Sequence, residues 1–340
     1  AAITFAAYAT SIAPDDVSPW IEKALACTLM IVLTVVHATN RRNSGGLQVA
    51  FTVLKVAVII AFCIFALALA DDKQTLRFLP VDGDGALLTS GAFAVSLIYV
   101  SYAYTGWNAA TYLSSEVERP QQTLPAILLT GTLVVTLLYV ALNYVFLRVA
   151  SMDAMVGQVE VGYVAAQAAF GYAGGRFTGL ALALLLISTV SAMTIAGPRV
   201  LQVIGQDFNG LRILSRTNRD GVPYVAIYFQ STLAIIFILT SSFESILVFA
   251  GFTLALNSLV TVLGVFILRW REPDLPRPYR TFAFPIPPLI YLALTGWTLV
   301  FVLINKPIEG LFGLGIVAAG LVFYFLSASG NRADSAASDA

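Results

Sequence analysis

The sequence has 340 residues, of which 58% are hydrophobic and only 11% are charged. A soluble domain carries about a quarter charged residues, so this composition excludes a soluble globular protein and indicates an integral membrane protein. Basic and acidic residues balance at 19 each, and no basic run suggests a nucleic-acid partner. Cys27 and Cys63 both lie in apolar segments, which favours two membrane-buried thiols over a disulfide.

The apolar segments predict a bundle of membrane-spanning helices. Residues 1–13 are too short to cross a bilayer, which takes about 20 residues, so we interpret them as the second half of a helix. The short apolar segment 160–174 predicts an interfacial or re-entrant helix, and the small, polar residues 328–340 predict a disordered tail. Nine longer apolar segments are each predicted to span the membrane: 22–40, 46–70, 87–113, 125–148, 177–197, 223–241, 244–268, 284–304 and 309–327.

The basic residues predict the orientation of these spans. Twelve arginines fall in one set of alternate loops, six basic residues fall in the opposite set, and Lys55 lies inside a span. Cytoplasmic loops are enriched in lysine and arginine, so the C-terminus and the loop 269–283 are predicted to be cytoplasmic. The span 87–113 then runs from outside to inside.

The middle of the span 87–113 is unusual for a membrane helix. It places polar and bulky groups and a glycine at mid-membrane depth, where a helix break is tolerated only if its backbone lines a cavity. A broken helix offers carbonyls to an ammonium and amides to a carboxylate, so an amino acid or related amine is the expected ligand. The candidate substrate-binding residues are Tyr102, Ala103, Tyr104, Thr105, Gly106 and Trp107, and Asn108 is a candidate for the pathway.

The alternative for this stretch is structural. Gly106 could permit close helix packing, and the aromatic residues could belong to an interfacial belt. Trp107 lies well short of the charged end at Glu116, which argues against the belt. Tyr102, just before the predicted break, could close over a substrate as an aromatic lid.

Lys55 is the most costly residue to bury. It lies about eight residues, or about 12 Å, into its helix, where a lysine costs at least ~2.5 kcal/mol on insertion scales. Its ammonium could snorkel to the surface, or it could face the bundle interior in place of a coupling cation. Because burial lowers a lysine pKa in general, the second interpretation fits a proton-coupled cycle.

Hydroxyl groups cluster in the span 177–197. Ser188 and Ser191 share a helix face and could meet Lys55 or a cation, although hydroxyls in membrane helices also bond to their own backbone. Asn257 is the lone amide of its helix and is a second candidate for the pathway. His37, the only histidine, lies near the cytoplasmic end of its helix, which favours an interfacial position over a proton relay.

Motifs of enzymes are absent. The sequence has no GxSxG, HExxH or Walker-type motif and no paired Cys/His spacing, so neither catalysis nor a metal or cofactor is predicted. The acidic residues fall almost entirely in loops, which makes a membrane-embedded enzyme or a receptor-like bundle a remote alternative.

Five stretches together resemble the amino acid–polyamine–organocation (APC) transporters. SYAYTGWNAATYLSSEVERPQQTLPAILLTGTLVVTLLYVALNYVF is similar to helices six and seven of that family. The other stretches are LQVAFTVLKVAVI, SAMTIAGPRVLQVIGQDF, NRDGVPYVAIYFQ and REPDLPRPYRTFAFPIPPLIY, and the resemblance covers nearly the whole chain in order.

This resemblance implies an all-α polytopic membrane protein with two inverted five-helix repeats. It implies one transmembrane domain over 1–327, with a partial first repeat in 1–70, a second repeat in 87–268 and two extra helices in 284–327. It places Lys55 on helix five, where a lysine replaces the sodium of related symporters in some members. It places residues 102–107 in the unwound part of helix six, against the substrate, and the serine cluster on helix eight, near the cation position.

One part of the family pattern is missing from this sequence. The glycine-rich broken segment of helix one, which holds the substrate carboxylate, has no counterpart, and the pair Gly83 and Gly85 lies in a polar loop. We therefore expect a fragment that lacks helices one and two and part of three. The expected function is secondary transport of amino acids or amines across the cytoplasmic membrane, driven by protons or by exchange, with sodium symport as the alternative.

Overall fold

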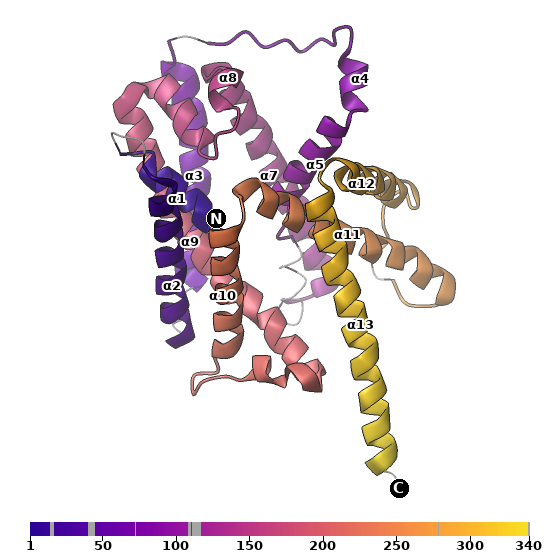
Figure 1. Ribbon diagram of the computed structural model, residues 1–340. Coiled ribbons are helices and arrows are strands. Elements are labelled where there is room, and N and C mark those ends of the chain that lie inside the picture. Colours follow the sequence, from indigo (N-terminus) through magenta and orange to yellow (C-terminus); the bar gives the residue numbers. More distant parts are fainter. Residues whose placement is uncertain are drawn as a thin grey trace. The chain divides into compact units, whose positions relative to one another are not determined.

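The computed structural model describes residues 1–13, 17–39, 45–71, 73–107, 110, 117–277 and 279–338, with the backbone alone for 45–47 and 328–338. All regular secondary structure in this part of the chain is helical (Figure 1). Helices are expected here because in hydrocarbon every backbone amide and carbonyl must be paired within its own segment. The prediction of an all-α protein is confirmed.

The chain divides into two compact units, and each is described by itself. The first unit comprises Ala1–Phe78 and Thr136–Ser241, and the second comprises Leu79–Val135 and Ser242–Ala340. The long helix α7 (Pro120–Val149) contributes its first part to the second unit and its last part to the first.

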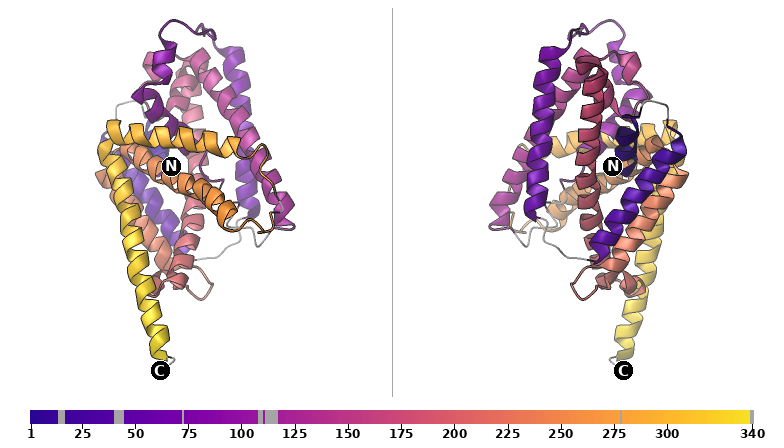
Figure 2. Two further views of the ribbon diagram at one scale, coloured as in Figure 1. Left: turned by 90° about the vertical axis from the view of Figure 1, so that its right-hand side faces the viewer. Right: turned by 90° about the vertical axis from the view of Figure 1, so that its left-hand side faces the viewer.

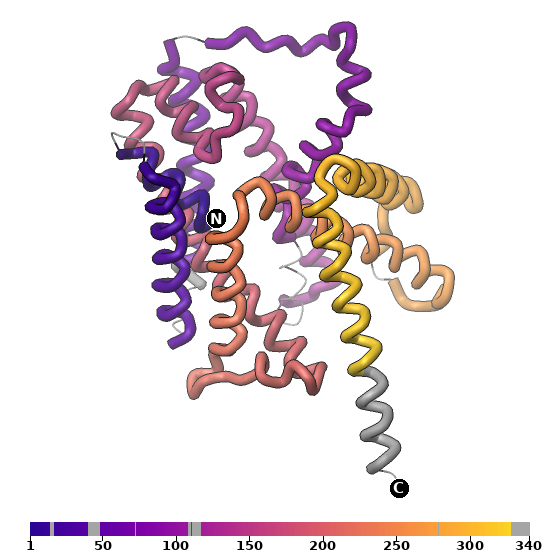
Figure 3. The backbone as a smooth tube through the Cα atoms, viewed as in Figure 1, coloured from indigo at the N-terminus to yellow at the C-terminus, as the bar shows by residue number. Residues whose placement is uncertain are grey.

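The first unit is built around α9. Its other elements are α1 (Ala2–Thr10), α2 (Pro19–Thr39), α3 (Gly45–Leu69), α8 (Met152–Met155), the 3₁₀ helix η1 (Asn209–Ser215) and α10 (Tyr224–Thr240), and α9 itself spans Val161–Asp207. α2 and α10 lie side by side (Figures 2 and 3). Lys23 Nζ donates to the Leu239 carbonyl at 2.9 Å, and Thr34 Oγ1 donates to Ser231 Oγ at 2.7 Å, so the two helices are antiparallel.

A glycine interrupts α9. Gly171 has φ +72°, in the left-handed region that L side chains rarely adopt, and it separates a short helix from the longer remainder. The sequence predicts two helices here, at 160–174 and 177–197, and the break falls inside the first of these. The interfacial or re-entrant position of the short helix stays a prediction.

The second unit contains the helices that follow the long loop after α3. They are α4 (Asp84–Leu88), α5 (Gly91–Ala103), α11 (Phe243–Arg271), α12 (Ile286–Asn305) and α13 (Pro307–Ser338). Ser90 and Ser242 cap α5 and α11, because each side chain accepts a bond from the amide three residues on. Lys306 alone separates α12 from α13, which meet at a sharp turn (Figure 2, left).

Seven helices in the described residues are long and apolar enough to cross a membrane. They are α2, α3, α7, α9, α11, α12 and α13, and the shorter apolar helices α5 and α10 correspond to the two remaining predicted spans. Large apolar side chains cover the outer surface, such as Leu129 at 73% and Phe177 at 76% exposure. This surface suits a lipid environment and would make a soluble protein aggregate.

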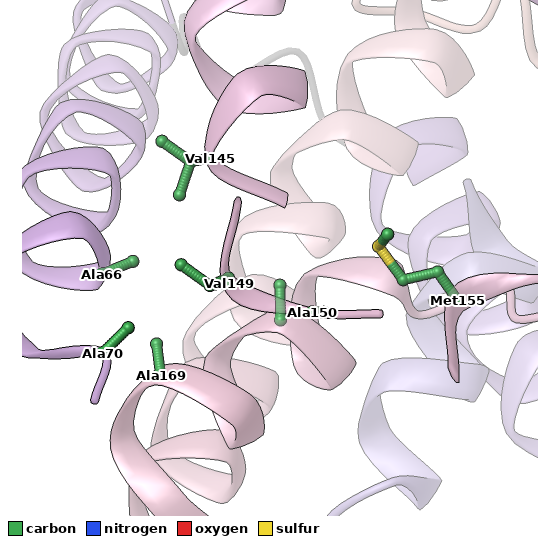
Figure 4. Packing of buried hydrophobic residues seen from close by; sticks show 8 residues of the cluster. Ala66, Ala70, Val145, Val149, Ala150, Met155 and Ala169 are labelled. Carbon is green, nitrogen blue, oxygen red and sulfur yellow. The ribbon is translucent and has the colours of Figure 1, made fainter. Parts of the chain in front are cut away.

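Small residues let the helices of the first unit approach closely. Ala66 and Ala70, at the end of α3, meet Val145 and Val149 of α7 and Ala169 of α9 (Figure 4). Membrane helices gain little from excluding lipid, so such close packing is what holds them together. A second cluster joins α1, α2, α9 and α10, and in the second unit a third joins α5, α11 and α12.

Two predictions about organisation remain predictions. The division of 1–327 into one domain with inverted repeats is one of them. The other is the disordered tail: the backbone of α13 runs to Ser338, and the side chains beyond Ser327 lie outside the described residues.

Candidate functional site

α5 ends at Ala103, inside the predicted span 87–113, whose helix the sequence predicts to be broken in the middle. The Tyr104 amide bonds to the carbonyls of Val100 and Ser101, and the Thr105 amide bonds to the Tyr102 carbonyl at 3.0 Å. These short-range bonds tighten the last turn and stop the helix. α5 thus ends where polar residues enter the apolar run, and Asn108 lies outside the described residues.

Gly106 fixes the geometry of this break. Its φ is +105°, and a Cβ built on it meets no atom within 4 Å. The demand for glycine is therefore conformational, because a side chain would strain the backbone without striking a neighbour. Thr105 Oγ1 also donates a hydrogen bond to the Tyr102 carbonyl at 2.7 Å, so the threonine side chain stabilises the same turn.

A cavity of about 310 Å³ opens beside the break in the second unit. Its volume lies within the range of small-molecule sites, and no charged side chain lines it. Its lining combines hydroxyl groups with apolar and aromatic surface from four helices and the break: Val100, Ser101, Tyr104, Thr105, Trp107, Thr132, Gly251, Leu254, Ala255, Ser258, Tyr291 and Thr295.

Three of the predicted binding residues, Tyr104, Thr105 and Trp107, line this cavity. Tyr102, the predicted lid, packs toward α11 instead, where a Cβ built on Gly251 would lie 3.8 Å from Tyr102 Cβ. Ala103 and Gly106 form the backbone of the break without lining the cavity. The substrate-binding roles of all six residues stay predictions.

The opposite wall of the cavity is not among the residues predicted from the sequence. Ser258 lines it, whereas the neighbouring Asn257, the predicted pathway residue, is exposed and does not. Residues adjacent on a helix point about 100° apart, so the lone amide of α11 was a poor guide to its cavity face. A better signal was available in Ser258 and Ala255, small residues three apart on one face.

A polar cluster holds α5 to α11 in the second unit. Tyr99 Oη donates to Glu244 Oε1 at 3.2 Å, and Lys306 Nζ lies 2.7 Å from the same oxygen. Ser245 Oγ donates to Glu309 Oε1 at 2.9 Å. The hydrogen bond to Glu244 and that residue's negative charge raise the pKa of Lys306. The half-helix before the break is therefore anchored to its neighbours.

Lys55 contacts a hydroxyl in the first unit. Its Nζ donates to Thr189 Oγ1 at 2.9 Å, which joins α3 to α9. The side chain is half-buried and is directed at α9 rather than along α3 toward the surface. The sequence pointed to Ser188 and Ser191 as the hydroxyls near Lys55, and the structure identifies Thr189 as its partner instead.

The two predicted serines have different surroundings. Ser188 is 6% exposed, and its Oγ has no hydrogen-bond partner among the described residues. Ser191 Oγ lies 2.8 Å from His37 Nε2 on α2. His37 was interpreted as interfacial from its position near a helix end, and the structure shows that its ring contacts α9. The ion-coupling roles of Ser188, Ser191 and Lys55 stay predictions.

These helices define a polytopic membrane protein in which α5 ends beside a cavity. Comparison with known proteins then identifies its family: the family model described as "Amino acid permease" matches residues 1–328, and the chain belongs to this family. The predicted relationship to the APC transporters is confirmed, and with it the all-α polytopic fold.

Relatives in this family are transporters by name. The chain is 25% identical over 306 residues to the human b(0,+)-type amino acid transporter 1, covering 89% of this chain and 62% of that protein. It is 27% identical over 321 residues to the human large neutral amino acids transporter small subunit 2, covering 89% of this chain and 57% of that protein. The chain therefore spans less than two thirds of the length of these relatives.

Proposed function

We propose that the protein containing this chain carries amino acids or related amines across the cytoplasmic membrane by alternating access. The observation that carries this proposal is the end of α5, inside the predicted span 87–113, at a neutral, hydroxyl-lined cavity. The carboxyl end of α5 carries the negative pole of its helix dipole, which favours a substrate ammonium near the break. The names of the relatives, which are amino acid transporters, agree with this substrate class.

The cavity lining supports a role in receiving the substrate side chain. Trp107 and Leu254 offer apolar surface, while Ser258 and Thr295 offer hydroxyls, and no lining residue carries a charge. Such a lining accommodates neutral side chains, because an ionised group buried there would lack a partner. We expect neutral amino acids to be transported better than acidic or basic ones.

The same proposal assigns coupling to protons or to exchange. The Lys55 ammonium, held by Thr189, would repel a sodium ion placed beside it, which argues against the sodium-coupled alternative. A lysine can lose and regain a proton within a cycle, whereas it cannot leave its site as an ion does. The arginine-rich loops place the C-terminus on the cytoplasmic side in this proposal.

Uptake into proteoliposomes tests the transport proposal. The whole polypeptide is reconstituted and supplied with a radiolabelled mixture of the twenty amino acids, with and without an internal amino acid pool. We expect uptake or exchange that survives removal of sodium. Transport of no amino acid and no polyamine would overturn the proposal, and strict sodium dependence would restore the alternative.

A substitution at the cavity wall tests the site. Leu254→Trp places a large ring in the cavity and should reduce uptake, with larger substrates affected most. Val260→Trp lies on the same helix, is 58% exposed and does not line the cavity, so it should transport normally. Equal uptake by the two variants would contradict the assigned role of the cavity.

A substitution of Lys55 tests the coupling. Lys55→Ala removes the ammonium that contacts Thr189, and we expect uptake to become independent of an imposed proton gradient. The measurement compares uptake with and without an inwardly directed gradient in wild type and variant. Unchanged dependence on the gradient would show that Lys55 has only a structural or surface role.

A further inference from the structure

His37 joins α2 to α9 through a bond whose direction depends on protonation. Its Nε2 lies 2.8 Å from Ser191 Oγ, and both side chains are half-buried. A neutral imidazole has one nitrogen that donates and one that accepts, whereas the protonated ring donates from both. In the neutral ring, Ser191 can donate to Nε2; once the ring is protonated, Ser191 can only accept.

This change matters because of where Ser191 lies. Two residues earlier on α9, Thr189 accepts the bond from Lys55, and Ser188, the residue before Thr189, is buried without a partner among the described residues. When protonated His37 occupies a lone pair of Ser191, the serine hydroxyl hydrogen turns to another acceptor. The protonation of His37 therefore changes how α9 is held on the side of α2, while Lys55 holds the same helix from α3 through Thr189.

The elements packed against α2 bring few other titratable groups. They are α1, α9 and α10. α9 has no titratable side chain from 177 to 198. On α1, the Tyr8 hydroxyl accepts a hydrogen bond from the Gly162 amide at 3.0 Å. Tyr224 of α10 packs on a small cluster around Ala38, one residue from His37.

Charged side chains lie toward the helix ends: Glu22 and Lys23 begin α2, Arg199 follows the stretch 177–198 of α9, and others lie past the end of α2. Asn218 Nδ2 donates to the Ala38 carbonyl at 3.2 Å, and beside Asn218 in the same loop are the exposed Arg219 and Asp220. The Arg41 and Arg42 side chains lie outside the described residues. Histidine is also the one side chain whose ordinary pKa, about 6.5, falls in the physiological range.

We propose that His37 is a positioning residue whose protonation sets the hydrogen-bond direction of Ser191, and that this adds a second pH-dependent step to the transport cycle beside Lys55. The inference rests on the proposed function for its effect on transport. The bond itself can be measured independently of transport.

The test is the pH profile of amino-acid uptake by the whole polypeptide in proteoliposomes. The labelled mixture of twenty amino acids is supplied from pH 5 to pH 8.5 without a pH gradient. We expect an inflection in this range in the wild type, which His37→Gln removes because glutamine keeps a polar partner for Ser191 but does not titrate.

Two further variants separate titration from packing. Ser191→Ala keeps the histidine but removes its partner, and it should also flatten the inflection. Thr34→Val deletes a comparable bond on the same helix, the 2.7 Å contact of Thr34 with Ser231, and should retain the inflection even if the overall rate falls. A flat wild-type profile, or an inflection that persists in His37→Gln, would overturn the inference.

Thermal unfolding of the purified protein supplies a readout that does not need transport. The difference in melting temperature between wild type and His37→Gln should change sign or size between pH 5 and pH 8.5. If the wild type transports nothing, the proposed function fails, and this difference still decides whether the bond titrates. A difference that is constant with pH overturns the inference, and Ser191→Ala provides the same measurement if His37→Gln does not fold.

Discussion

The break after α5 predicts a large effect of the smallest possible substitution, Gly106→Ala. The added methyl group meets no atom within 4 Å, so it costs no packing energy. It does force a residue with a Cβ to hold φ +105°, which costs roughly 1–3 kcal/mol. Gly131→Ala is the matched control, because its methyl group also meets nothing within 4 Å but Gly131 lies inside the helix α7. There, alanine should stabilise by roughly 0.5–1 kcal/mol.

The two substitutions should therefore differ by about 1.5–4 kcal/mol in the free energy of unfolding, with opposite signs. Denaturant titration of the purified whole polypeptide, followed by circular dichroism, measures this difference. Uptake measured in parallel should fall for Gly106→Ala and remain normal for Gly131→Ala. Equal stabilities for the two variants would refute the argument that the left-handed glycine holds the break.

Two further substitutions test how α5 is held in the second unit. Gly251→Ala places a Cβ 2.6 Å from Ile98 Cγ2 and should destabilise the protein by about 1–3 kcal/mol. Gly264→Ala on the same helix is the control, because its Cβ meets nothing within 4 Å. Similar unfolding free energies for the two variants would contradict the close α5–α11 contact. Glu244→Gln should cost less than about 1 kcal/mol at pH 7, because Lys306 and Glu244 are 37% and 57% exposed, and molar salt should reduce the effect further. The bond raises the pKa of Lys306, so its contribution is complete below the unfolded lysine pKa of about 10.4 and is lost as the pH rises through the folded value. A pH series of unfolding free energies measures this, and a wild-type advantage that grows above that pH would contradict it.

The transmembrane helices could be predicted because hydropathy and length decide them. An apolar run of about 20 residues has few alternatives to a helix in hydrocarbon, which explains the agreement between predicted segments and observed helices. The end of α5 before Gly106 was also readable, because polar residues and a glycine entered an apolar run. The exact break in α9 was less evident: Gly171 adopts the left-handed conformation, whereas the pair Gly174 and Gly175 lies within the helix.

The partners of the polar side chains were not predictable from the sequence. Helix periodicity groups residues such as Ser188 and Ser191 on one face, but it does not fix how α9 is rotated against α3. The structure turns Thr189 toward Lys55, and the neighbouring positions therefore point elsewhere. The cavity has the same origin: its wall includes Ser258 of α11, and only the packing of that helix identifies which of its small residues faces the break.

The geometry of α9 connects Lys55 and His37, which contact it from α3 and α2. Positions two apart on a helix project about 200° from each other, so Thr189 and Ser191 reach opposite sides. Lys55 on α3 binds one of them and His37 on α2 binds the other, which means that α9 is held between two side chains whose charge can change. Loss of a proton from Lys55 weakens one attachment, and gain of a proton by His37 reverses the other. Because both events act on the same helix, the double variant Lys55→Ala/His37→Gln should change the pH profile by an amount different from the sum of the single variants, and strict additivity would show that α9 does not link them.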